Sequence, residues 1–345
     1  MVRAPEYPPI TPTGDAGHVP VMLAEVLAFL APRDGDLVVD GTFGGGSYSL
    51  AILDAADCRV YGIDRDVDAI SRAERMANDN PRLVPVLGRF GDMDELMAEA
   101  GAPKVDAVVL DIGVSSFQID QGERGFSFMK PGPLDMRMGA TGPTAADVVN
   151  YMSESDLADV IFRLGEERQA RRIARQIVQH RVAAPFETTK DLADVVEAAV
   201  GGRRGARTHP ATLTFQAIRM YVNSELEELA KAMQAAEAIL RPGGRLVIVT
   251  FHSLEDRMVK RWLRGRSGKT SGGSRHLPAM SAGPEATFDM AISKAVTPSA
   301  KEVEGNPRAR SAKLRSAVRT SVPPRTEAPD DGMDLPSLSD LENAA

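Results

Sequence analysis

The chain has 345 residues, of which 43% are hydrophobic and 26% charged, and its formal net charge is −7. This composition indicates a globular protein with one large domain or two smaller ones. The lone Cys58 excludes an internal disulfide and a cysteine metal cluster, and no apolar run reaches the roughly 18 residues of a membrane span. We therefore expect a cytoplasmic protein with no metal and no membrane partner.

The first structural signal is a strand, a glycine loop and a helix start. Residues 1–17 are rich in proline and glycine and are predicted to be disordered. A short helix is expected over 20–30, and an apolar strand follows and ends in Asp40. Glycines at 41 and 44–46 then lead into an amphipathic segment, which is the pattern of the first βα unit of a nucleotide-binding α/β sheet.

A second predicted strand ends in Asp64, where an acid can bind ribose hydroxyls. The loop lacks the G-x-G-x-x-G fingerprint and the G-K-S/T of a P-loop. The charge of Asp40 would oppose a pyrophosphate and suit a cation. S-adenosylmethionine has an adenosine, a sulfonium and an amino group but no phosphate. The loop therefore resembles the cofactor loop of Rossmann-like methyltransferases.

The third and fourth strands are predicted over 83–87 and 105–110. Phe90 follows the third strand, where it either stacks on the adenine or belongs to the core. Asp111 ends the fourth strand. Ligands of open α/β sheets lie outside the carboxyl ends of the strands, so Asp111 and the loop after it should face the reacting centre.

The fifth strand is predicted only at 245–250, so the residues between form an insertion. Its first part, 123–138, is loop-like. Its second part is helical, with a capping box of Ser153 and Asp156, an apolar stripe over 170–177, and a helix from Thr188 to Gly201.

The pattern from Thr212 to Leu240 predicts one long helix, which ends at a Pro-Gly-Gly before the fifth strand. A basic helix around Trp262 should follow, then a mobile segment over 265–287. A β-like stretch at 313–318 is expected to complete the sheet edge, and the chain beyond 322 to be disordered.

Basic residues gather in three segments, whereas acids gather in the last 25 residues. A basic face with an acidic tail is compatible with RNA binding, and solvated helix faces are the alternative for each cluster taken singly. The residues predicted to bind RNA are Arg168, Arg171, Arg172, Arg175, Arg203, Arg204, Arg207, Arg257, Lys260, Arg261 and Arg264.

Several longer motifs together are similar to those of one family. They are Asp40-Gly-Thr-Phe-Gly, Ile63-Asp-Arg-Asp, Leu110-Asp-Ile-Gly-Val-Ser-Ser, Glu123-Arg-Gly-Phe-Ser-Phe, Gly132-Pro-Leu-Asp-Met-Arg-Met, Gly165-Glu-Glu-Arg, His209-Pro-Ala-Thr, Val222-Asn-Ser-Glu-Leu, Phe251-His-Ser-Leu-Glu-Asp-Arg and Asn306-Pro-Arg-Ala-Arg-Ser-Ala-Lys-Leu-Arg. In this order they resemble the bacterial 16S ribosomal RNA cytosine-N4 methyltransferase family, RsmH or MraW, from about residue 18 to 319.

The resemblance implies a class I methyltransferase acting on a cytidine in the decoding region of the small ribosomal subunit. Ser47 departs from the family pattern, and a serine there would strain the loop if its φ were positive. The residues expected to bind the cofactor, from the strand ends and the resemblance together, are Asp40, Gly44, Gly46, Ser47, Tyr48, Asp64, Phe90, Asp111 and Gln118.

The amine of cytosine is a poor nucleophile because its lone pair is delocalised into the ring, so the enzyme must position it against the methyl group. Asp111 is the candidate that orients cofactor or amine, with Asp135 or Ser115 as further catalytic contacts. The alternative is that Asp111 only binds cofactor. His252 is expected to cap a helix or lie in the core rather than act as a base.

The predicted organisation is an α/β, Rossmann-like class I methyltransferase sheet (18–112 and 210–320) with an inserted loop and helical substrate-recognition subdomain (113–209) and a disordered acidic tail (321–345). The expected partner is 16S ribosomal RNA within the small subunit, and a homodimer is left open. The alternatives are a methyltransferase for another RNA or DNA amino group, an NAD-dependent dehydrogenase and a non-enzymatic RNA-binding factor.

Overall fold

The structure is a computed structural model that describes residues 20–113, 116–203, 205, 208–268, 284–327, 335–336 and 338. The chain divides into two compact units. Unit 1 comprises Met1–Gly113 and Glu227–Asp331, and unit 2 comprises Val114–Leu226 and Gly332–Ala345. Unit 1 contains the sheet and unit 2 is helical. The predicted disorder of residues 1–17 lies outside the described part of the chain.

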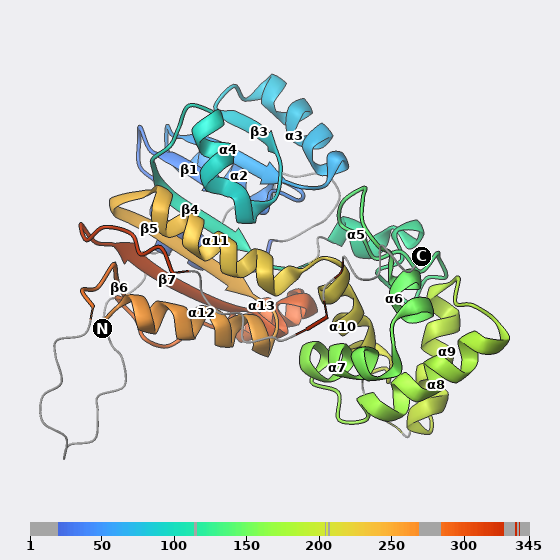
Figure 1. Ribbon diagram of the computed structural model, residues 1–345. Helices are drawn as coiled ribbons and strands as arrows, with labels where there is room; N and C mark the ends of the chain where they lie inside the picture. The colour runs from blue at the N-terminus through green and yellow to red at the C-terminus, as the bar shows by residue number, and fades with distance from the viewer. Residues whose placement is uncertain are drawn as a thin grey trace, which may run out of the picture. The chain divides into compact units, whose positions relative to one another are not determined.

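Within its described residues, unit 1 holds a seven-stranded sheet in the order β3-β2-β1-β4-β5-β7-β6 (Figure 1). The strands are β1 (Leu37–Asp40), β2 (Arg59–Asp64), β3 (Leu83–Leu87), β4 (Val105–Asp111), β5 (Leu240–Thr250), β6 (Phe288–Asp289) and β7 (Lys313–Arg319). Strands β1 to β5 are parallel, and β7 and β6 are antiparallel to their neighbours. The carboxyl ends of the five parallel strands therefore share one edge.

Helices cover both faces of this sheet, which explains the nearly continuous apolar sequences of its central strands. Helices α1 (Leu23–Leu30), α2 (Ser47–Ala55) and α3 (Val67–Asp79) share one core cluster with the strands. Figure 1 views the other face, with α4 (Met93–Glu99), α11 (Glu225–Ile239) and α12 (Ser253–Arg266) in front. The short elements are η1 (Phe90–Asp92), α13 (Ala300–Gly305) and η3 (Pro307–Ser311). No helix among the described residues is long and apolar enough to cross a bilayer.

The strands predicted at 83–87, 105–110 and 245–250 are confirmed, but two details at the end of the sheet were wrong. Strand β7 is not the edge, because β6 pairs with its outer side through Phe288 and Arg319. Phe288 is fully buried against Trp262, with ring centroids 5.3 Å apart. The predicted tail is also held at its start, since Arg325 donates to the carbonyl of Glu285 at 2.8 Å.

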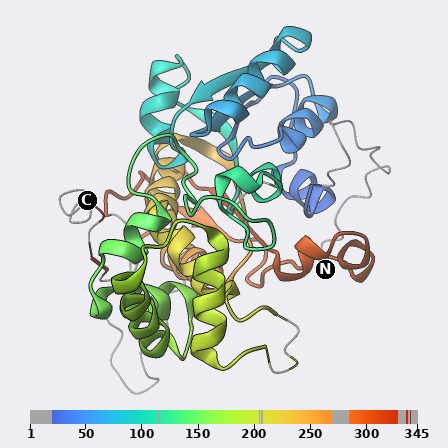
Figure 2. The same cartoon turned by 90° about the vertical axis from the view of Figure 1, so that its right-hand side faces the viewer.

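Unit 2 consists of helices joined by a long loop. The elements are α5 (Ser116–Asp120), η2 (Gly122–Arg124), α6 (Ala145–Tyr151), α7 (Glu154–Gly165), α8 (Ala170–Ala183), α9 (Thr189–Val200) and α10 (Thr212–Val222). Figure 2 shows these green to yellow helices; α7 packs against α8 and α10, and α8 against α9.

The helix caps in unit 2 follow the sequence signals. The helix predicted from Thr188 is α9, where Thr188 forms a capping box with Asp191 and Gly201 ends the helix with φ 84°. Ser153 caps α7, but its hydroxyl also donates to the Asp156 side chain, so the predicted box is only half formed. Gly165 is needed for packing: a Cβ there would lie 2.6 Å from the Leu213 carbonyl oxygen.

The single long helix predicted from Thr212 is wrong. It is broken into α10 and α11 at Asn223 and Ser224, and Ser224 has φ 49°. The Asn223 side chain is buried, donates to the Met136 carbonyl at 2.8 Å and accepts from the Met138 amide at 2.8 Å. These bonds to a distant loop fix the break between α10 and α11. The apolar periodicity from Thr212 does not reveal them.

Replacing Asn223 by alanine should destabilise unit 2. The change leaves a buried carbonyl and a partly buried amide without this partner, at about 1–3 kcal/mol each, so we expect a loss of about 2–6 kcal/mol in the free energy of unfolding. Urea unfolding followed by circular dichroism measures it. The control Gln179→Ala removes an exposed amide whose oxygen accepts from the Gln176 side chain and should change stability by under about 0.5 kcal/mol. Equal effects of the two changes would contradict this role of Asn223.

Candidate active site

The loop after β1 is shaped by a buried phenylalanine. Phe43 is 3% exposed, and its ring lies against both Gly46 and Gly62. A Cβ at Gly46 would lie 2.6 Å from the Phe43 Cζ, and a Cβ at Gly62 would lie 2.5 Å from its Cδ2. The two glycines therefore make room for the ring, which anchors the loop to the neighbouring strand β2.

The left-handed backbone positions of this loop fall on glycines. Gly44 has φ 51° and Gly46 has φ 78°, whereas Ser47 is the first residue of α2. The departure at Ser47 from the family pattern therefore introduces no strain, because the loop requires positive φ before it and not at it.

Two side chains hold Gly44 from opposite sides. The Asp64 Oδ2 accepts from the Gly44 amide at 2.8 Å, and Arg72 Nη1 donates to the Gly44 carbonyl at 2.7 Å. The other Asp64 oxygen accepts from the Asp66 amide at 2.9 Å. Each carboxylate oxygen has two acceptor sites, so Asp64 can bind a hydroxyl in addition. Burial, only partly offset by these amide bonds, raises the pKa of Asp64.

Asp40 lies beneath the loop, where its carboxylate is bonded within the protein. The residue is fully buried, and its carboxylate accepts from the Ser49 hydroxyl at 2.7 Å and the Thr42 amide at 3.2 Å. Burial raises its pKa to about 6, although the bonds from Ser49 and Thr42 act in the opposite direction. Asp40 thus supports the loop from inside and adds negative charge below it.

Tyr48, which was predicted to bind the cofactor, packs into the core. Its side chain is 5% exposed in the core, and its hydroxyl donates to the Val21 carbonyl of the segment before α1. The ring therefore joins α2 to that segment, and the side chain has no free donor for a cofactor.

Asp111 is the acid at this edge with an unsatisfied oxygen. Its amide donates to the Thr42 hydroxyl at 2.7 Å, while its Oδ1 is buried with no partner among the described residues. Burial first, and then the charges of Asp40 and Glu255, raise the pKa of Asp111 to about 8. A buried acceptor of this kind points to a ligand site.

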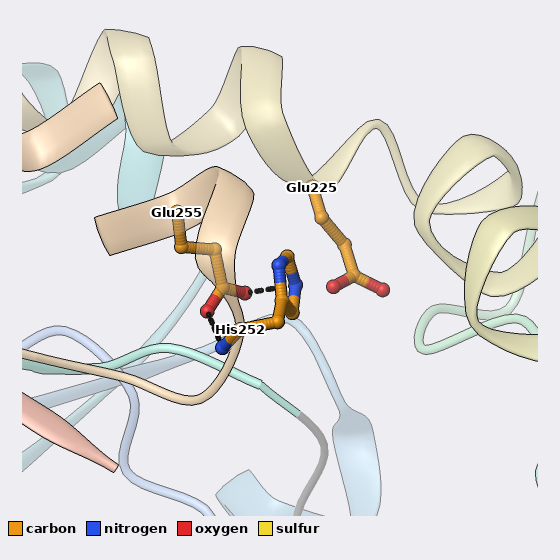
Figure 3. A group of neighbouring side chains, drawn as sticks. All are labelled: Glu225, His252 and Glu255. Atoms are coloured by element: carbon orange, nitrogen blue, oxygen red, sulfur yellow. Dashed lines mark hydrogen bonds and ion pairs between the residues drawn. The ribbon is translucent and has the colours of Figure 1, made fainter. Parts of the chain in front are cut away.

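Glu255, whose charge acts on Asp111, was not predicted from the sequence. Glu255 is fully buried in the first turn of α12, and its Oε2 accepts from the Phe251 amide at 2.9 Å. Its Oε1 lies 2.7 Å from His252 Nε2, and Figure 3 shows the two side chains together. The glutamate at the third helical position was the available signal, since it matches half of a capping box.

A second missed acid lies near Phe90, which is half-buried in η1. Glu228 in α11 is 4% exposed and pairs through Oε1 with Arg89 at 2.9 Å. Its Oε2 is buried with no partner in the described chain, and a Cβ at Gly91 would lie 3.1 Å from it. Nothing in the acid-rich start of this helix distinguishes the buried Glu228 from the exposed Glu227.

The strand register brings three of the predicted acids together. Asp40 pairs with Gly62 of β2 and Val109 of β4, so Asp64 and Asp111 lie two residues further along the two neighbouring strands. Asp111 in turn pairs with Val249 of β5, which leads to His252. The acidic edge, defined here as Asp40, Asp64, Asp111 and Glu255, belongs entirely to unit 1.

The remaining predicted catalytic and cofactor residues belong to unit 2. Gln118 is 6% exposed in α5, and Ser115 lies outside the described residues. Asp135 accepts from Arg137 Nε at 2.9 Å and from Nη2 at 2.7 Å. Burial raises the pKa of Asp135, but these bonds outweigh it and the net shift is downward. Asp135 is therefore an ionised partner of Arg137 rather than a proton acceptor.

The predicted RNA-binding residues lie on exposed surfaces where they are described. Arg168, Arg171, Arg172 and Arg175 are exposed at or before α8, and Arg203 is exposed after α9. Arg257, Lys260, Arg261 and Arg264 form the basic face of α12, and all four are exposed. Arg204 and Arg207 lie outside the described residues. Arg181 points inward instead and donates to the carbonyls of Val149 and Met152.

The sheet order, the glycine loop after β1 and the acids at three neighbouring strand ends define an α/β protein of the class I methyltransferase fold. The chain belongs to the MraW methylase family, whose model matches residues 15–320.

Curated relatives agree with this membership. The chain is 70% identical over 330 residues to the ribosomal RNA small subunit methyltransferase H of Hyphomonas neptunium, covering 96% of each protein. It is 52% identical to the protein of that name from Maricaulis maris, covering 95% of this chain and 99% of the relative. A solved rRNA methylase from Streptococcus thermophilus aligns over 88% of this chain and 99% of its own at 11% identity, with a TM-score of 0.40.

Replacing Asp111 by asparagine should stabilise unit 1 at alkaline pH. With its pKa raised to about 8, Asp111 holds a proton that the unfolded chain releases near pH 4. Stability is therefore lost as the pH rises from about 4 to about 8, and the substitution abolishes that loss. We expect the variant to gain about 2–5 kcal/mol at pH 8.5 and little at pH 4.5, measured by denaturant unfolding.

Asp256→Asn is the matched control in the same unit. Burial raises the pKa of Asp256, but hydrogen bonds from Arg315 at 2.7 Å and Lys313 at 3.0 Å outweigh it and lower the pKa overall. This carboxylate stabilises the fold above its unfolded pKa, so its loss should destabilise the protein at pH 8.5. If both variants shift stability in the same direction at that pH, then Asp111 is not an acid whose ionisation destabilises the fold.

Proposed function

We propose that this protein transfers the methyl group of S-adenosylmethionine to the exocyclic N4 of a cytidine in the decoding region of 16S ribosomal RNA. The observation that carries the proposal is the buried, unpartnered Asp111 oxygen on the acidic edge of a methylase-family sheet. The family and the 70% identical relative, which is named for small-subunit rRNA methylation, support the substrate class.

The residues present suit this methyl donor. Asp64 can accept from ribose hydroxyls while it holds Gly44, and the half-buried Phe90 offers a ring face to the adenine. The acidic edge favours a cation. The Gly44–Gly46 turn, the start of α2 at Ser47 and Gln118 complete the proposed cofactor set, whereas Asp40 contributes charge from below the loop and Tyr48 contributes packing.

The donor supplies an electrophilic methyl group, and the chain supplies position and a hydrogen-bond acceptor. An amine whose lone pair is delocalised must rehybridise as it attacks, and an acceptor on its N–H favours that change. Asp111 Oδ1 is available for this bond because it has no other partner among the described residues. Positioning of two reactants can contribute roughly 7–11 kcal/mol in well-oriented cases, so no metal or covalent intermediate is required.

In this proposal, exposed basic surfaces on each unit bind the ribosomal RNA. In unit 1 this is the basic face of α12, and in unit 2 it is the exposed arginine set at α8 with Arg203. Phosphate contacts through such residues should weaken steeply with salt. The basic face of α12 directly follows β5, whose carboxyl end lies at the acidic edge.

The function is tested by transfer of labelled methyl groups from S-adenosylmethionine to small ribosomal subunits that lack the modification, with mass mapping of the product nucleotide. We expect one N4-methylated cytidine in the decoding region. Label in another RNA or DNA amino group would assign a different substrate. Binding of NAD without any methyl transfer would favour the dehydrogenase alternative, and RNA binding without transfer would favour a non-enzymatic factor.

Removing the basic face of α12 should weaken RNA binding. The quadruple variant with alanine at Arg257, Lys260, Arg261 and Arg264 loses up to four phosphate contacts, and we expect its salt dependence, as log Kd against log salt, to flatten by about 0.9 per lost contact. Filter binding to small-subunit RNA at several salt concentrations measures this slope.

The exposed Arg59 at the opposite end of the sheet is the control. Arg59→Ala should leave the slope and the affinity unchanged within error. A quadruple variant that binds with the wild-type slope would remove α12 from the RNA-binding surface.

A further inference from the structure

The acidic edge concentrates negative charge in a buried place. Asp40 and Glu255 are fully buried, and the Asp111 Oδ1 is buried without a partner among the described residues. Asp64 adds a fourth carboxylate that acts on Asp40. Like charges at low dielectric cannot all remain ionised, so at least one acid must keep its proton.

Asp111 is the acid of this edge that keeps its proton. Asp40 accepts from Ser49 and Thr42, and Glu255 accepts from the Phe251 amide, whereas no donor among the described residues stabilises the Asp111 Oδ1. Titratable groups of unit 1 near the edge include His252, beside Glu255, and Tyr48, whose hydroxyl is bound to Val21. With its pKa raised to about 8, Asp111 is mostly protonated at pH 7 before a ligand binds.

We propose that binding of the cationic methyl donor displaces a proton from Asp111, and that the same carboxylate then takes the proton that the cytosine amine loses during transfer. The inference rests on the proposed function and deepens it. It makes Asp111 a proton acceptor whose charge follows the charge of the bound donor.

The charges of donor and product explain the coupling. The donor carries a sulfonium, an ammonium and a carboxylate and so has one net positive charge. The demethylated product has lost the sulfonium charge and has none. A positive charge near Asp111 favours the carboxylate, and its disappearance favours the acid. The buried edge therefore keeps nearly the same total charge with and without the donor.

Every bond, electron pair and proton of the methyl transfer has a place in this scheme. The amine lone pair forms the new N–C bond, the S–C bond breaks, and its electron pair stays on sulfur. The nitrogen loses one proton, and Asp111 accepts it and returns to its resting, neutral form. The site releases neutral product and is ready to exchange that proton for the next donor.

Isothermal titration calorimetry of the full chain in two buffers of different ionisation enthalpy measures the protons released on binding. At pH 7 a group with pKa near 8 is about nine-tenths protonated, so we expect roughly 0.5–0.9 proton released per S-adenosylmethionine. S-adenosylhomocysteine should release under about 0.2. At pH 9.5 the free protein has already lost this proton, so release from Asp111 should vanish.

The affinity for the donor should depend on pH, because donor binding is coupled to the loss of a proton from Asp111. Between pH 8.5 and 6.5 the Kd of the donor should rise about tenfold, whereas the Kd of the product should change less than twofold. The amino group of the ligand also titrates in this range. Asp111→Asn separates the two sources, because the variant should lose the pH dependence and the proton release that come from Asp111 and keep the part that comes from the amino group of the ligand.

Glu255→Gln provides a second variant in which Asp111 is retained. Removal of one neighbouring negative charge should lower the pH midpoint of proton release, since Glu255 is one of the charges that raise the pKa of Asp111. Donor binding in the wild type with no more proton release than product binding would overturn the proposal while leaving the proposed function intact. Absence of any donor binding would instead overturn the proposed function.

Discussion

The structure of unit 1 depends on acidic side chains that its sheet gathers at one edge and removes from water. Parallel strands place their carboxyl ends together, so acids that are far apart in the sequence meet at β1, β2 and β4. Their burial is unfavourable for folding and is only partly offset by hydrogen bonds. A site that is strained electrostatically when empty is suited to a ligand that brings the opposite charge.

The loop after β1 shows how this edge is kept in shape. Phe43 occupies the space that the absent side chains of Gly46 and Gly62 leave, and Asp64 and Arg72 fix the backbone of Gly44. These contacts involve β2 and α3 as well as the loop itself. The backbone that would meet a cofactor is therefore set by packing beneath it before any ligand arrives, which reduces the entropy lost on binding.

The charged features of the protein are distributed over both units. Unit 1 contains the acidic edge and the basic face of α12, and unit 2 contains the exposed arginines at α8. Within unit 2, Asn223 connects the break after α10 to the loop at 136–138. The loop that carries the Asp135–Arg137 pair is therefore held by main-chain contacts in a helical body rather than left as a free segment.

Periodicity, capping residues and glycine placement determined the strands β1 to β5, the caps of α7 and α9 and the acids at the strand ends, because these signals act between residues close in sequence. The sequence alone could not separate the roles of those acids. Asp40 and Asp111 end neighbouring strands, yet the carboxylate of Asp40 is bonded beneath the loop, whereas Asp111 Oδ1 has no partner in the described part of the chain. The positions of Glu255, Glu228, Tyr48 and the break at Asn223 were likewise decided only by tertiary structure. Burial and hydrogen-bond partners depend on residues that are distant in the chain, and a local pattern does not encode those contacts.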